Sequence, residues 1–257
     1  MFFNYVIKAS YGNDSVALIQ WAHESQLQRV ATLYNDTGWA HPDWPARVEK
    51  LEDWVSSLGF EPNRTKSIGL EQLVRNKKSW PRQGIQFCTA ELKIKPTLEW
   101  MDRVDPLKLA TSVIGIRREE SGNRKSFPEF QYSSPNEGGR DIWAPLVSYT
   151  ESDRDALLKR AGVEPLPHRS MECYPCINSN RAYLQQLTEQ RVAEIETIET
   201  SLGFTSNNKP RTMFRPYRYM GATGIRAIVR WAKSKRGKFD IDDGNGSSGC
   251  ETGYCGL

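Results

Sequence analysis

In the first half of the chain, short apolar runs alternate with longer stretches of helical periodicity. Residues 5–9, 29–34 and 111–116 are apolar-rich runs of strand length, which predict three buried strands. Residues 16–23 and 42–58 predict two helices, the second ending before Gly59. The second helix has its apolar side chains on one face: Trp44, Val48, Leu51, Trp54, Val55 and Leu58. This alternation predicts an α/β fold, with a mostly parallel sheet covered by helices on both faces.

The second half of the chain has a different pattern. Residues 128–140 are rich in turn formers and predict a lid-like loop. Residues 152–158 predict a helix with Ser152 as its N-cap. Residues 181–202 predict an amphipathic helix that Gly203 ends. The apolar stripe of that helix is formed by Leu184, Leu187, Ile195, Ile198 and Leu202.

These patterns divide the chain into two expected parts. Residues 1–180 hold the strands, helices and polar loops of one α/β domain. Residues 181–257 form a helical, basic C-terminal extension whose tail carries cysteines. Residues 242–249 (DDGNGSSG) have the composition of a flexible linker before that tail.

Composition narrows the class of protein. Hydrophobic residues make up 38% of the 257 residues and charged residues 26%, values typical of a globular protein. No apolar run reaches the roughly 18 residues of a membrane helix, and the N-terminus lacks a signal-peptide pattern. We therefore expect a cytoplasmic protein without a membrane partner. In a reducing compartment, five cysteines favour metal ligands or redox groups over structural disulfides.

Positive charge is concentrated in residues 209–238, which contain ten Lys or Arg and no acidic residue. Because the whole chain carries +4, the remainder carries −6. Such a segment indicates a polyanionic partner such as a nucleic acid. Its aromatic residues would then stack on bases: Phe214, Tyr217, Tyr219 and Trp231. The alternative is a basic surface helix packed through Ile225, Ile228, Val229 and Trp231.

Three polar loops follow the three predicted strands: SYGNDS at residues 10–15, NDTGW at 35–39 and RREESGNR at 117–124. The carboxyl ends of parallel strands meet at one edge of a sheet, where ligands of such folds bind. Arginines suit phosphate or sulfate there because a guanidinium binds either bidentately. The loops therefore predict one shared anion site.

The first loop has the features of a phosphate-binding turn. Backbone N–H groups at a helix N-terminus attract anions, and Gly12 permits a tight turn and close approach. Ser10 and Ser15 add hydroxyl groups, and Asp14 either braces the loop or holds Mg²⁺. The alternative is an ordinary strand-to-helix turn with a polar N-cap.

These loops resemble the PAPS reductase family and the related N-type ATP pyrophosphatases. SYGNDS is similar to their S-G-G-x-D-S loop, with Tyr11 in place of the first glycine. Residues 35–39 resemble the family's D-T-G segment, residues 114–124 its G-x-R-x-x-x-S-x-x-R segment, and residues 143–153 its P-L-x-x-W-T-x-x-D-V segment. The resemblance spans about residues 5–180 and implies a Rossmann-like fold of the HUP type.

The resemblance also implies roles for individual residues. Asp14 and Arg117 are expected to be catalytic. The nucleotide, ATP or the sulfonucleotides PAPS or APS, is expected to contact Ser10, Gly12, Asn13, Ser15, Asp36, Lys93 and Arg124. The Asp14–Ser15 pair is kept in the relatives that cleave ATP between its α and β phosphates.

Cys173 and Cys176 form a C-x-x-C motif, and Cys88 lies far upstream. Such a set holds a metal or an iron–sulfur cluster in many proteins, and a redox pair or buried thiols are the alternatives. The segment around Cys88 resembles that of Dnd-type DNA-sulfur-modification enzymes, which implies a [4Fe–4S] cluster. Its fourth iron would be open or bound by Cys250; a mononuclear zinc and the absence of any cluster also stay open.

The chain ends in Cys-Gly-Leu, which resembles the C-terminal tail of sulfonucleotide reductases. That resemblance makes Cys255 a candidate catalytic nucleophile. The alternative is an exposed tail with no catalytic cysteine.

Three functions follow from these features. The first is ATP cleavage at the α-phosphate that supports sulfur transfer to an acceptor such as nucleic acid, with a cysteine desulfurase as sulfur donor. The second is a PAPS or APS reductase that releases sulfite and depends on a thioredoxin-like donor. The third is nucleotide or nucleic-acid binding without turnover. A homo-oligomer is compatible with each of them.

Overall fold

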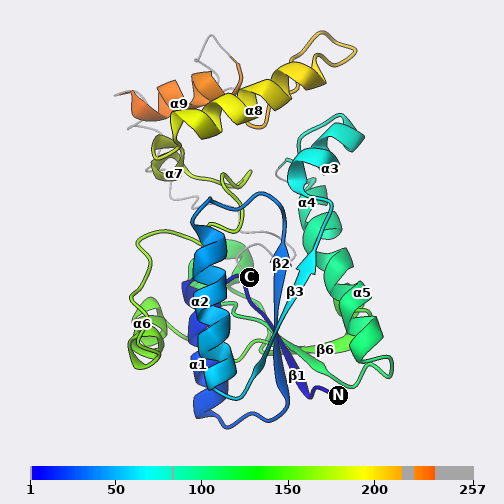
Figure 1. Ribbon diagram of the computed structural model, residues 1–257, viewed down its shortest axis with the longest axis vertical. Coiled ribbons are helices and arrows are strands. Elements are labelled where there is room, and N and C mark those ends of the chain that lie inside the picture. Colours follow the sequence, from blue (N-terminus) through cyan, green and yellow to red (C-terminus); the bar gives the residue numbers. More distant parts are fainter. Residues whose placement is uncertain (1, 83, 216–222, 235–257) are drawn as a thin grey trace.

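The computed structural model describes residues 2–82, 84–215 and 223–234, and these residues form a six-stranded sheet (Figure 1). The strand order is β3-β2-β1-β4-β6-β5. All neighbouring strands run parallel except β5, which pairs antiparallel with β6 at one edge. The strands are β1 (Tyr5–Lys8), β2 (Val30–Asp36), β3 (Glu61–Lys66), β4 (Thr111–Val113), β5 (Phe130–Ser134) and β6 (Arg140–Trp143).

Helices cover both faces of the sheet. Adjacent residues of β1 point to opposite sides, so that Ile7 packs under α1 and α2 while Val6 packs with Trp100 of α5. Figure 1 shows α1 and α2 on one side and α5 on the other. The helices up to this point of the chain are α1 (Asn13–Glu24), α2 (Trp44–Ser57), α3 (Leu70–Lys77), α4 (Phe87–Thr89), the π-helical turn η1 (Ala90–Ile94) and α5 (Lys95–Val104). The predicted α/β class with a mostly parallel, doubly covered sheet is confirmed.

The remaining helical elements follow β4. Short 3₁₀ turns occupy the loops on either side of β5, and α6 packs against α1. These elements are η2 (Arg118–Glu120), η3 (Gly122–Arg124), η4 (Pro135–Glu137), α6 (Glu151–Arg160), α7 (Arg181–Gln185), α8 (Glu189–Leu202) and α9 (Ile225–Lys233). Across the described part of the chain, no helix combines the length and apolar character needed to cross a membrane.

The prediction of a lid-like loop at residues 128–140 is wrong. The segment contains β5 and η4, and β6 begins at its last residue. Pairing with β6 supplies hydrogen bonds that the turn-forming composition did not reveal. The ring of Phe130 also stacks on Trp143, with centroids 5.3 Å apart.

Two helix boundaries differ from the predictions. Thr150, and not Ser152, caps α6: its hydroxyl accepts a hydrogen bond from the Asp153 N–H at 3.2 Å, while the Asp153 carboxylate accepts from the Thr150 N–H at 2.8 Å. This reciprocal capping box requires the acidic residue three positions after the cap. The predicted helix at residues 181–202 is broken into α7 and α8, because Thr188 starts a new helix by accepting from the N–H of Arg191.

The sequence pattern predicted no helix or strand between Glu61 and Val104, although this segment contributes an edge strand and a chain of helices. The sequence of β3, EPNRTK, lacks apolar alternation because the strand lies at the edge of the sheet with its side chains partly exposed. Edge strands of this polar kind give no periodic signal. The run from α4 through η1 to α5 carries Cys88 and Lys93 toward the end of the sheet where the polar loops lie.

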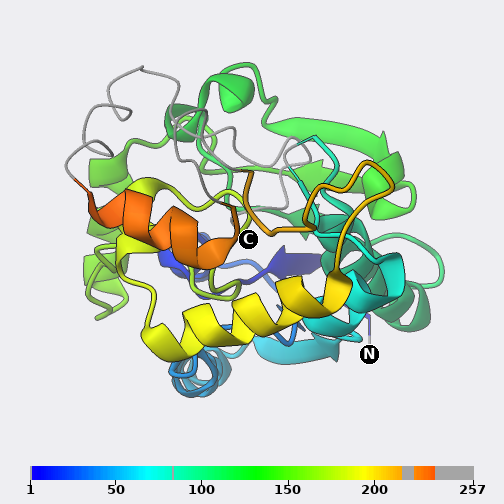
Figure 2. The same cartoon turned by 90° about the horizontal axis from the view of Figure 1, so that it is seen from above.

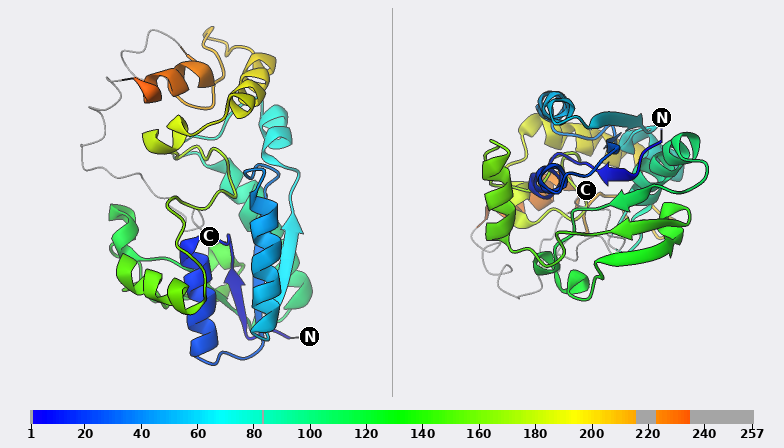
Figure 3. Two further views of the ribbon diagram at one scale, coloured as in Figure 1. Left: turned by 60° about the vertical axis from the view of Figure 1, so that its left-hand side comes forward. Right: turned by 90° about the horizontal axis from the view of Figure 1, so that it is seen from below.

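Helices α7, α8 and α9 of the C-terminal extension pack as a layer beyond the carboxyl ends of the strands (Figure 3). Helices α8 and α9 lie side by side in this layer, as the view from above shows (Figure 2). One apolar core joins Trp39 and Trp80 to Ile195 and Ile228. The guanidinium of Arg191 also lies 3.7 Å from the ring centre of Trp39. The predicted division at residue 180 stays a prediction, and its two parts share this core.

A buried ion pair lies beneath the carboxyl end of β1. Lys8 and Glu137 are both at most 1% exposed, and their charged atoms are 3.1 Å apart. The Lys8 ammonium also contacts the Met101 sulfur at 3.2 Å, and Glu137 accepts a hydrogen bond from Ser112 at 2.5 Å. Burial lowers the pKa of Lys8, and the neighbouring carboxylate opposes that effect.

A second buried pair joins Arg140 of β6 to Asp105, at 2.8 Å. The Asp105 carboxylate also accepts hydrogen bonds from the N–H groups of Leu109 and Ala110, at 3.0 and 3.1 Å. Burial by itself would raise the pKa of Asp105. The guanidinium and the two N–H groups more than offset it, so the pKa lies below its ordinary value.

Acid should therefore destabilise the fold through Asp105. The unfolded carboxyl titrates near pH 3.9 and the folded one lower, so the unfolded state binds the proton first. This stabilisation is complete above about pH 4 and is lost as the pH falls through the folded value. Urea unfolding between about pH 5 and pH 2 should show a steeper loss of stability in the wild type than in Asp105→Asn. Parallel pH profiles would contradict the prediction.

Candidate functional site

The loop between β1 and α1 presents an open helix N-terminus. Gly12 is the N-cap residue in an extended conformation, and no side-chain hydrogen bond caps the helix. The Ser10 hydroxyl accepts from the Gly12 N–H at 3.4 Å, and the Ser15 hydroxyl donates to the Gly12 carbonyl at 3.1 Å. The first N–H groups of this 12-residue helix are thus available to an anion.

Two close approaches at this loop exclude larger residues. A Cβ atom on Gly12 would lie 2.9 Å from the Cβ of Ser170, so the segment after α6 rests directly on the loop. A Cβ atom on Gly115 would lie 3.1 Å from the Asp14 carbonyl oxygen. The segment after β4 therefore also contacts the loop, and the first and third polar loops meet here.

Tyr11 occupies the position where related loops have glycine, and its backbone is left-handed at φ 57°. That conformation costs a non-glycine residue about 1–2 kcal/mol. The side chain compensates, because it is fully buried and its hydroxyl lies 3.2 Å from the Thr32 hydroxyl. The Tyr11 carbonyl also accepts a hydrogen bond from Arg47 at 2.9 Å.

We expect Tyr11→Gly to lower the free energy of unfolding by about 2–4 kcal/mol. Losing a buried aromatic ring costs about 3–5 kcal/mol, and relief of the backbone strain returns about 1 kcal/mol. Tyr11→Phe, the matched control, keeps the ring and should lose about 1 kcal/mol with the hydroxyl contact. Urea unfolding measures both, and a Tyr11→Gly protein as stable as the wild type would show that strain dominates.

Asn13 fastens the loop to a distant segment. Its side-chain amide donates to the Leu166 carbonyl and accepts from the Leu166 N–H, both at 2.9 Å. Both ends of the amide are thus occupied by Leu166, so the side chain fixes the position of the loop. Gly12, Asn13 and Asp14 line the cavity described below, whereas Ser10 and Ser15 are buried and not among its lining residues.

The catalytic candidates Asp14 and Arg117 form an ion pair. Arg117 Nε donates to Asp14 Oδ1 at 2.7 Å, and Arg117 Nη1 lies 3.1 Å from a carboxylate oxygen of Glu119. Arg117 is 5% exposed, so the pair is largely shielded from water. The Asp14 carboxylate thus braces the first loop against the guanidinium that follows β4, and its alternative role with Mg²⁺ stays a prediction.

The second loop approaches the site through Thr37. The Asp36 carboxylate accepts from the Gly38 N–H at 2.9 Å and shapes the turn after β2. Thr37 lines the cavity, and its hydroxyl donates to the Glu172 carbonyl at 2.9 Å. Asp36 itself is not among the lining residues, so its contact with a nucleotide stays a prediction.

Two further predicted cations, Lys93 and Arg124, also reach the site. Lys93 pairs with Glu172, and both side chains are largely buried. Arg124 pairs with Glu120 across one turn of the chain. All four residues line the same cavity.

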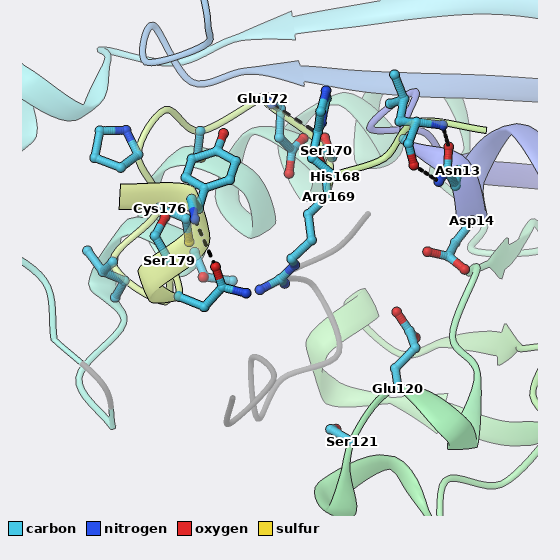
Figure 4. A pocket seen from close by; sticks show the side chains of 18 of the residues that line it. Asn13, Asp14, Glu120, Ser121, His168, Arg169, Ser170, Glu172, Cys176 and Ser179 are labelled. Atoms are coloured by element: carbon cyan, nitrogen blue, oxygen red, sulfur yellow. Dashed lines mark hydrogen bonds between the residues drawn. The ribbon is translucent and has the colours of Figure 1, made fainter. Parts of the chain in front are cut away.

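One cavity of about 470 Å³ unites these elements at the carboxyl end of the sheet (Figure 4). One wall carries Asp14 and Glu120, and the other carries Cys176 and Ser179. Backbone at the tips of all three predicted strands borders it, through Gly12, Thr37 and Arg117. The expected convergence of the three loops is therefore found in the folded chain.

Three cysteines from two distant segments line this cavity. They are Cys88 of α4 and the pair Cys173 and Cys176 in the loop before α7, and none is in a disulfide. Burial raises the pKa of the Cys88 thiol to about 11, and the nearby Cys176 adds to the effect. Burial also raises the pKa of Cys173, whose sulfur lies 3.8 Å from the Thr37 hydroxyl. The folded chain thus places the three predicted thiols around one cavity.

Thiols suit an iron–sulfur cluster in kind, and clusters ordinarily use four of them. The described residues supply three, from Cys88, Cys173 and Cys176. Within those same ranges, no three His, Cys, Asp or Glu side chains are close enough to hold a metal ion. The mononuclear zinc that the sequence left open therefore also stays a prediction. The cluster stays a prediction.

Several lining residues were not predicted: Arg154, His168, Arg169, Glu172, Ser179 and Tyr183. The hydroxyls of Ser179 and Tyr183 are buried with no hydrogen-bond partner among the described residues. Arg154 comes from α6 and Tyr183 from α7, and the other four come from the irregular segment around the C-x-x-C motif, where no periodicity marks a site. The nearest signal is the motif itself, three residues before Ser179.

The basic segment at residues 209–238 is described only in part. Phe214 and Trp231 pack against the apolar core around α8, and Arg226 of α9 pairs with Glu189 and Glu196. The described aromatic residues thus follow the packing alternative. Tyr217 and Tyr219, like Cys250 and Cys255, lie outside the described residues.

The sheet order and the cavity beyond its strand ends define a Rossmann-like α/β protein of the HUP type. A family model described as the phosphoadenosine phosphosulfate reductase domain matches residues 4–178. The chain belongs to this PAPS reductase family, which confirms the resemblance seen in its loops.

Individual relatives are distant. A 37.8 kDa protein of Escherichia phage 186 is 24% identical over 98% of this chain and 96% of its own length. The PAPS reductase of Photobacterium profundum is 22% identical over 61% of this chain and 59% of its own, and that of Klebsiella pneumoniae is 26% identical over 49% and 50%. The crystal structure of Candida auris PAPS reductase in a phosphate complex superposes with a TM-score of 0.47 at 13% identity, covering 64% of this chain and 76% of that one.

Proposed function

We propose that this chain binds ATP with its phosphates at the N-terminus of α1 and cleaves it between the α and β phosphates. The observation that carries this proposal is the Asp14–Arg117 pair beside the uncapped helix end, in a cavity that also holds three thiols. The Asp-Ser pair of this loop is the feature that the resemblance links to ATP cleavage.

In the proposed reaction an acceptor oxygen attacks the α-phosphorus, and the bond to the β-phosphate oxygen breaks. Pyrophosphate leaves, and the acceptor carries AMP. A sulfur nucleophile then displaces AMP and forms the new bond to the acceptor. The N–H groups of α1 and the Arg117 guanidinium would stabilise the charge that develops on the phosphates. Mg²⁺ would enter with the ATP phosphates as part of the substrate.

The sulfur source and the acceptor complete the proposal. A [4Fe–4S] cluster at Cys88, Cys173 and Cys176 would supply an open iron that binds sulfide. A cysteine desulfurase is the proposed sulfur donor. The acceptor is a nucleic acid bound through residues 209–238, whose described part exposes Lys209, Arg215 and Arg230.

A second candidate is a reductase acting on PAPS or APS. It is favoured by the match to the phosphoadenosine phosphosulfate reductase domain and by the similarity to two bacterial PAPS reductases. In that reaction the Cys255 thiolate would attack the sulfonate sulfur, the nucleotide phosphate would leave, and a thioredoxin-like dithiol would release sulfite and become a disulfide. A third candidate is binding without turnover.

The assay that separates these candidates compares products from purified full-length protein. Pyrophosphate released from ATP alone supports the first candidate. Sulfite released from PAPS or APS with reduced thioredoxin supports the second. Nucleotide binding with no release of pyrophosphate or sulfite supports the third candidate, binding without turnover. Asp14→Asn serves as the matched variant, and it should abolish pyrophosphate release while the protein remains folded by circular dichroism.

The cluster is tested separately by anaerobic purification, iron and sulfide analysis and a visible absorption spectrum. The expected result is iron and sulfide in the wild type and their loss in Cys88→Ala and Cys176→Ala. An iron-free, colourless wild type would contradict the cluster. The proposed ATP cleavage would still be tested by the release of pyrophosphate.

A further inference from the structure

The cations around the cavity differ in how they are neutralised. Five Lys or Arg residues line it, and four of them lie against a carboxylate. These four pairs are Lys93–Glu172, Arg117–Asp14, Arg124–Glu120 and Arg154–Glu151. The fifth, Arg169, has no Asp or Glu oxygen of the described residues within 4.0 Å.

The Arg169 side chain extends into the cavity. Figure 4 shows it between the wall that carries Cys176 and Ser179 and the wall that carries Asp14 and Glu120. The residue is exposed, so its guanidinium is available to a ligand. Its charge also acts on Tyr183: burial raises the pKa of that phenol, and Arg169 opposes the rise.

The backbone at Arg169 is held by the phosphate loop itself. The Asn13 side chain binds both the N–H and the carbonyl of Leu166. Ser170 lies against Gly12, and its hydroxyl is 3.5 Å from the Ser10 carbonyl. The carbonyl of Arg169 lies 2.8 Å from the ring of His168. The backbone of residues 166–170 is thus held against the loop at the N-terminus of α1, and the Arg169 side chain extends from this segment into the cavity.

We infer that Arg169 binds a second oxyanion of the substrate, a phosphate or sulfate group that lies beyond the phosphate held by the helix N-terminus. The inference rests on the proposed nucleotide site and deepens it. The thiols Cys173 and Cys176 follow Arg169 closely in the chain and line the same cavity. A group bound by Arg169 therefore lies on the side where sulfur chemistry would take place.

The chemistry of the group follows from the guanidinium. Arginine is always charged and presents paired N–H donors that match two oxygens of a phosphate or sulfate. The four paired cations each share their positive charge with a carboxylate, so a ligand gains less net charge from any one of them than from Arg169. A guanidinium in the same cavity that has no carboxylate partner among the described residues discriminates between nucleotides with one oxyanion and those with two, which makes Arg169 a specificity-determining residue.

The test measures dissociation constants by titration calorimetry on the full-length protein. AMP, ATP, adenylyl sulfate and inorganic pyrophosphate are the probes, and Arg169→Gln and Arg169→Lys are the variants. Arg160→Gln is the matched control, because Arg160 is exposed, pairs with Glu24 and does not line the cavity. Thermal unfolding of each variant establishes that the fold is kept.

Arg169→Gln should weaken the binding of ATP or of adenylyl sulfate by about 10-fold or more and change the dissociation constant of AMP by less than about 2-fold. Arg169→Lys should recover part of the lost affinity, because it keeps the charge. If the affinity for ATP and pyrophosphate falls, the group bound by Arg169 is a phosphate. If the affinity for adenylyl sulfate falls, the group is a sulfate. Equal weakening of all nucleotides, or of none, would overturn the inference. If the wild type binds no nucleotide, the proposed function fails. In that case the inference on Arg169 holds if pyrophosphate binding is weakened in Arg169→Gln, and it is overturned if pyrophosphate binding is unchanged.

Discussion

Replacing Arg140 with alanine should lower the free energy of unfolding by about 3–5 kcal/mol, the cost of leaving a buried charge without its partner. The Arg140 side chain is fully buried. It pairs with Asp105 at 2.8 Å and with Asp102 at 3.0 Å, and it donates to the carbonyls of Asp105 and Glu137 at 2.7 and 3.3 Å. Alanine would leave the Asp105 carboxylate and both carbonyls without these donors.

Urea unfolding followed by circular dichroism at neutral pH measures this loss. Arg64→Ala is the matched control, because Arg64 pairs with Glu52 at 2.5 Å but is 46% exposed. That change should cost less than about 1 kcal/mol, as surface ion pairs do. Similar losses in the two variants would show that the burial of Arg140 does not determine how much it contributes to the free energy of unfolding.

Replacing Arg117 with glutamine should weaken ATP binding by about 2–4 kcal/mol, which corresponds to roughly 30- to 1,000-fold. The change removes a guanidinium from the site and leaves Asp14 without its partner at 2.7 Å. The unpaired carboxylate would then repel the phosphates at the end of α1. This repulsion predicts a larger loss for Arg117→Gln than for Asp14→Asn.

A double-mutant cycle tests that reasoning. If Asp14 acts through its pairing with Arg117, the double variant Asp14→Asn/Arg117→Gln should bind ATP better than Arg117→Gln alone. Calorimetric dissociation constants for the wild type and the three variants provide the measurement, and urea unfolding reports any loss of folded protein. Strictly additive effects would show that the two residues act independently, and the bracing role of Asp14 would then be wrong.

The local sequence predicted those features that depend on neighbouring residues. Apolar runs and helical spacing located β1, α1, β2, α2 and β4, and the loops after the three strands indicated a shared site. Local patterns failed where pairing partners decide the structure. The turn formers of residues 128–140 conceal β5, because its hydrogen bonds come from β6. The polar sequence of β3 conceals a strand because only one neighbour covers it.

The candidate site divides in the same way. Residue type and order by themselves indicated the family, the loop predicted to bind phosphate and the three cysteines that line the cavity, because these depend on short sequence motifs. Tertiary structure alone decided that Asp14 binds Arg117, that Asn13 holds Leu166, and that Arg169 is the lining cation without a carboxylate partner among the described residues. Such contacts join residues about 100 or more positions apart, and they form because packing against the sheet closes distances that no sequence spacing records.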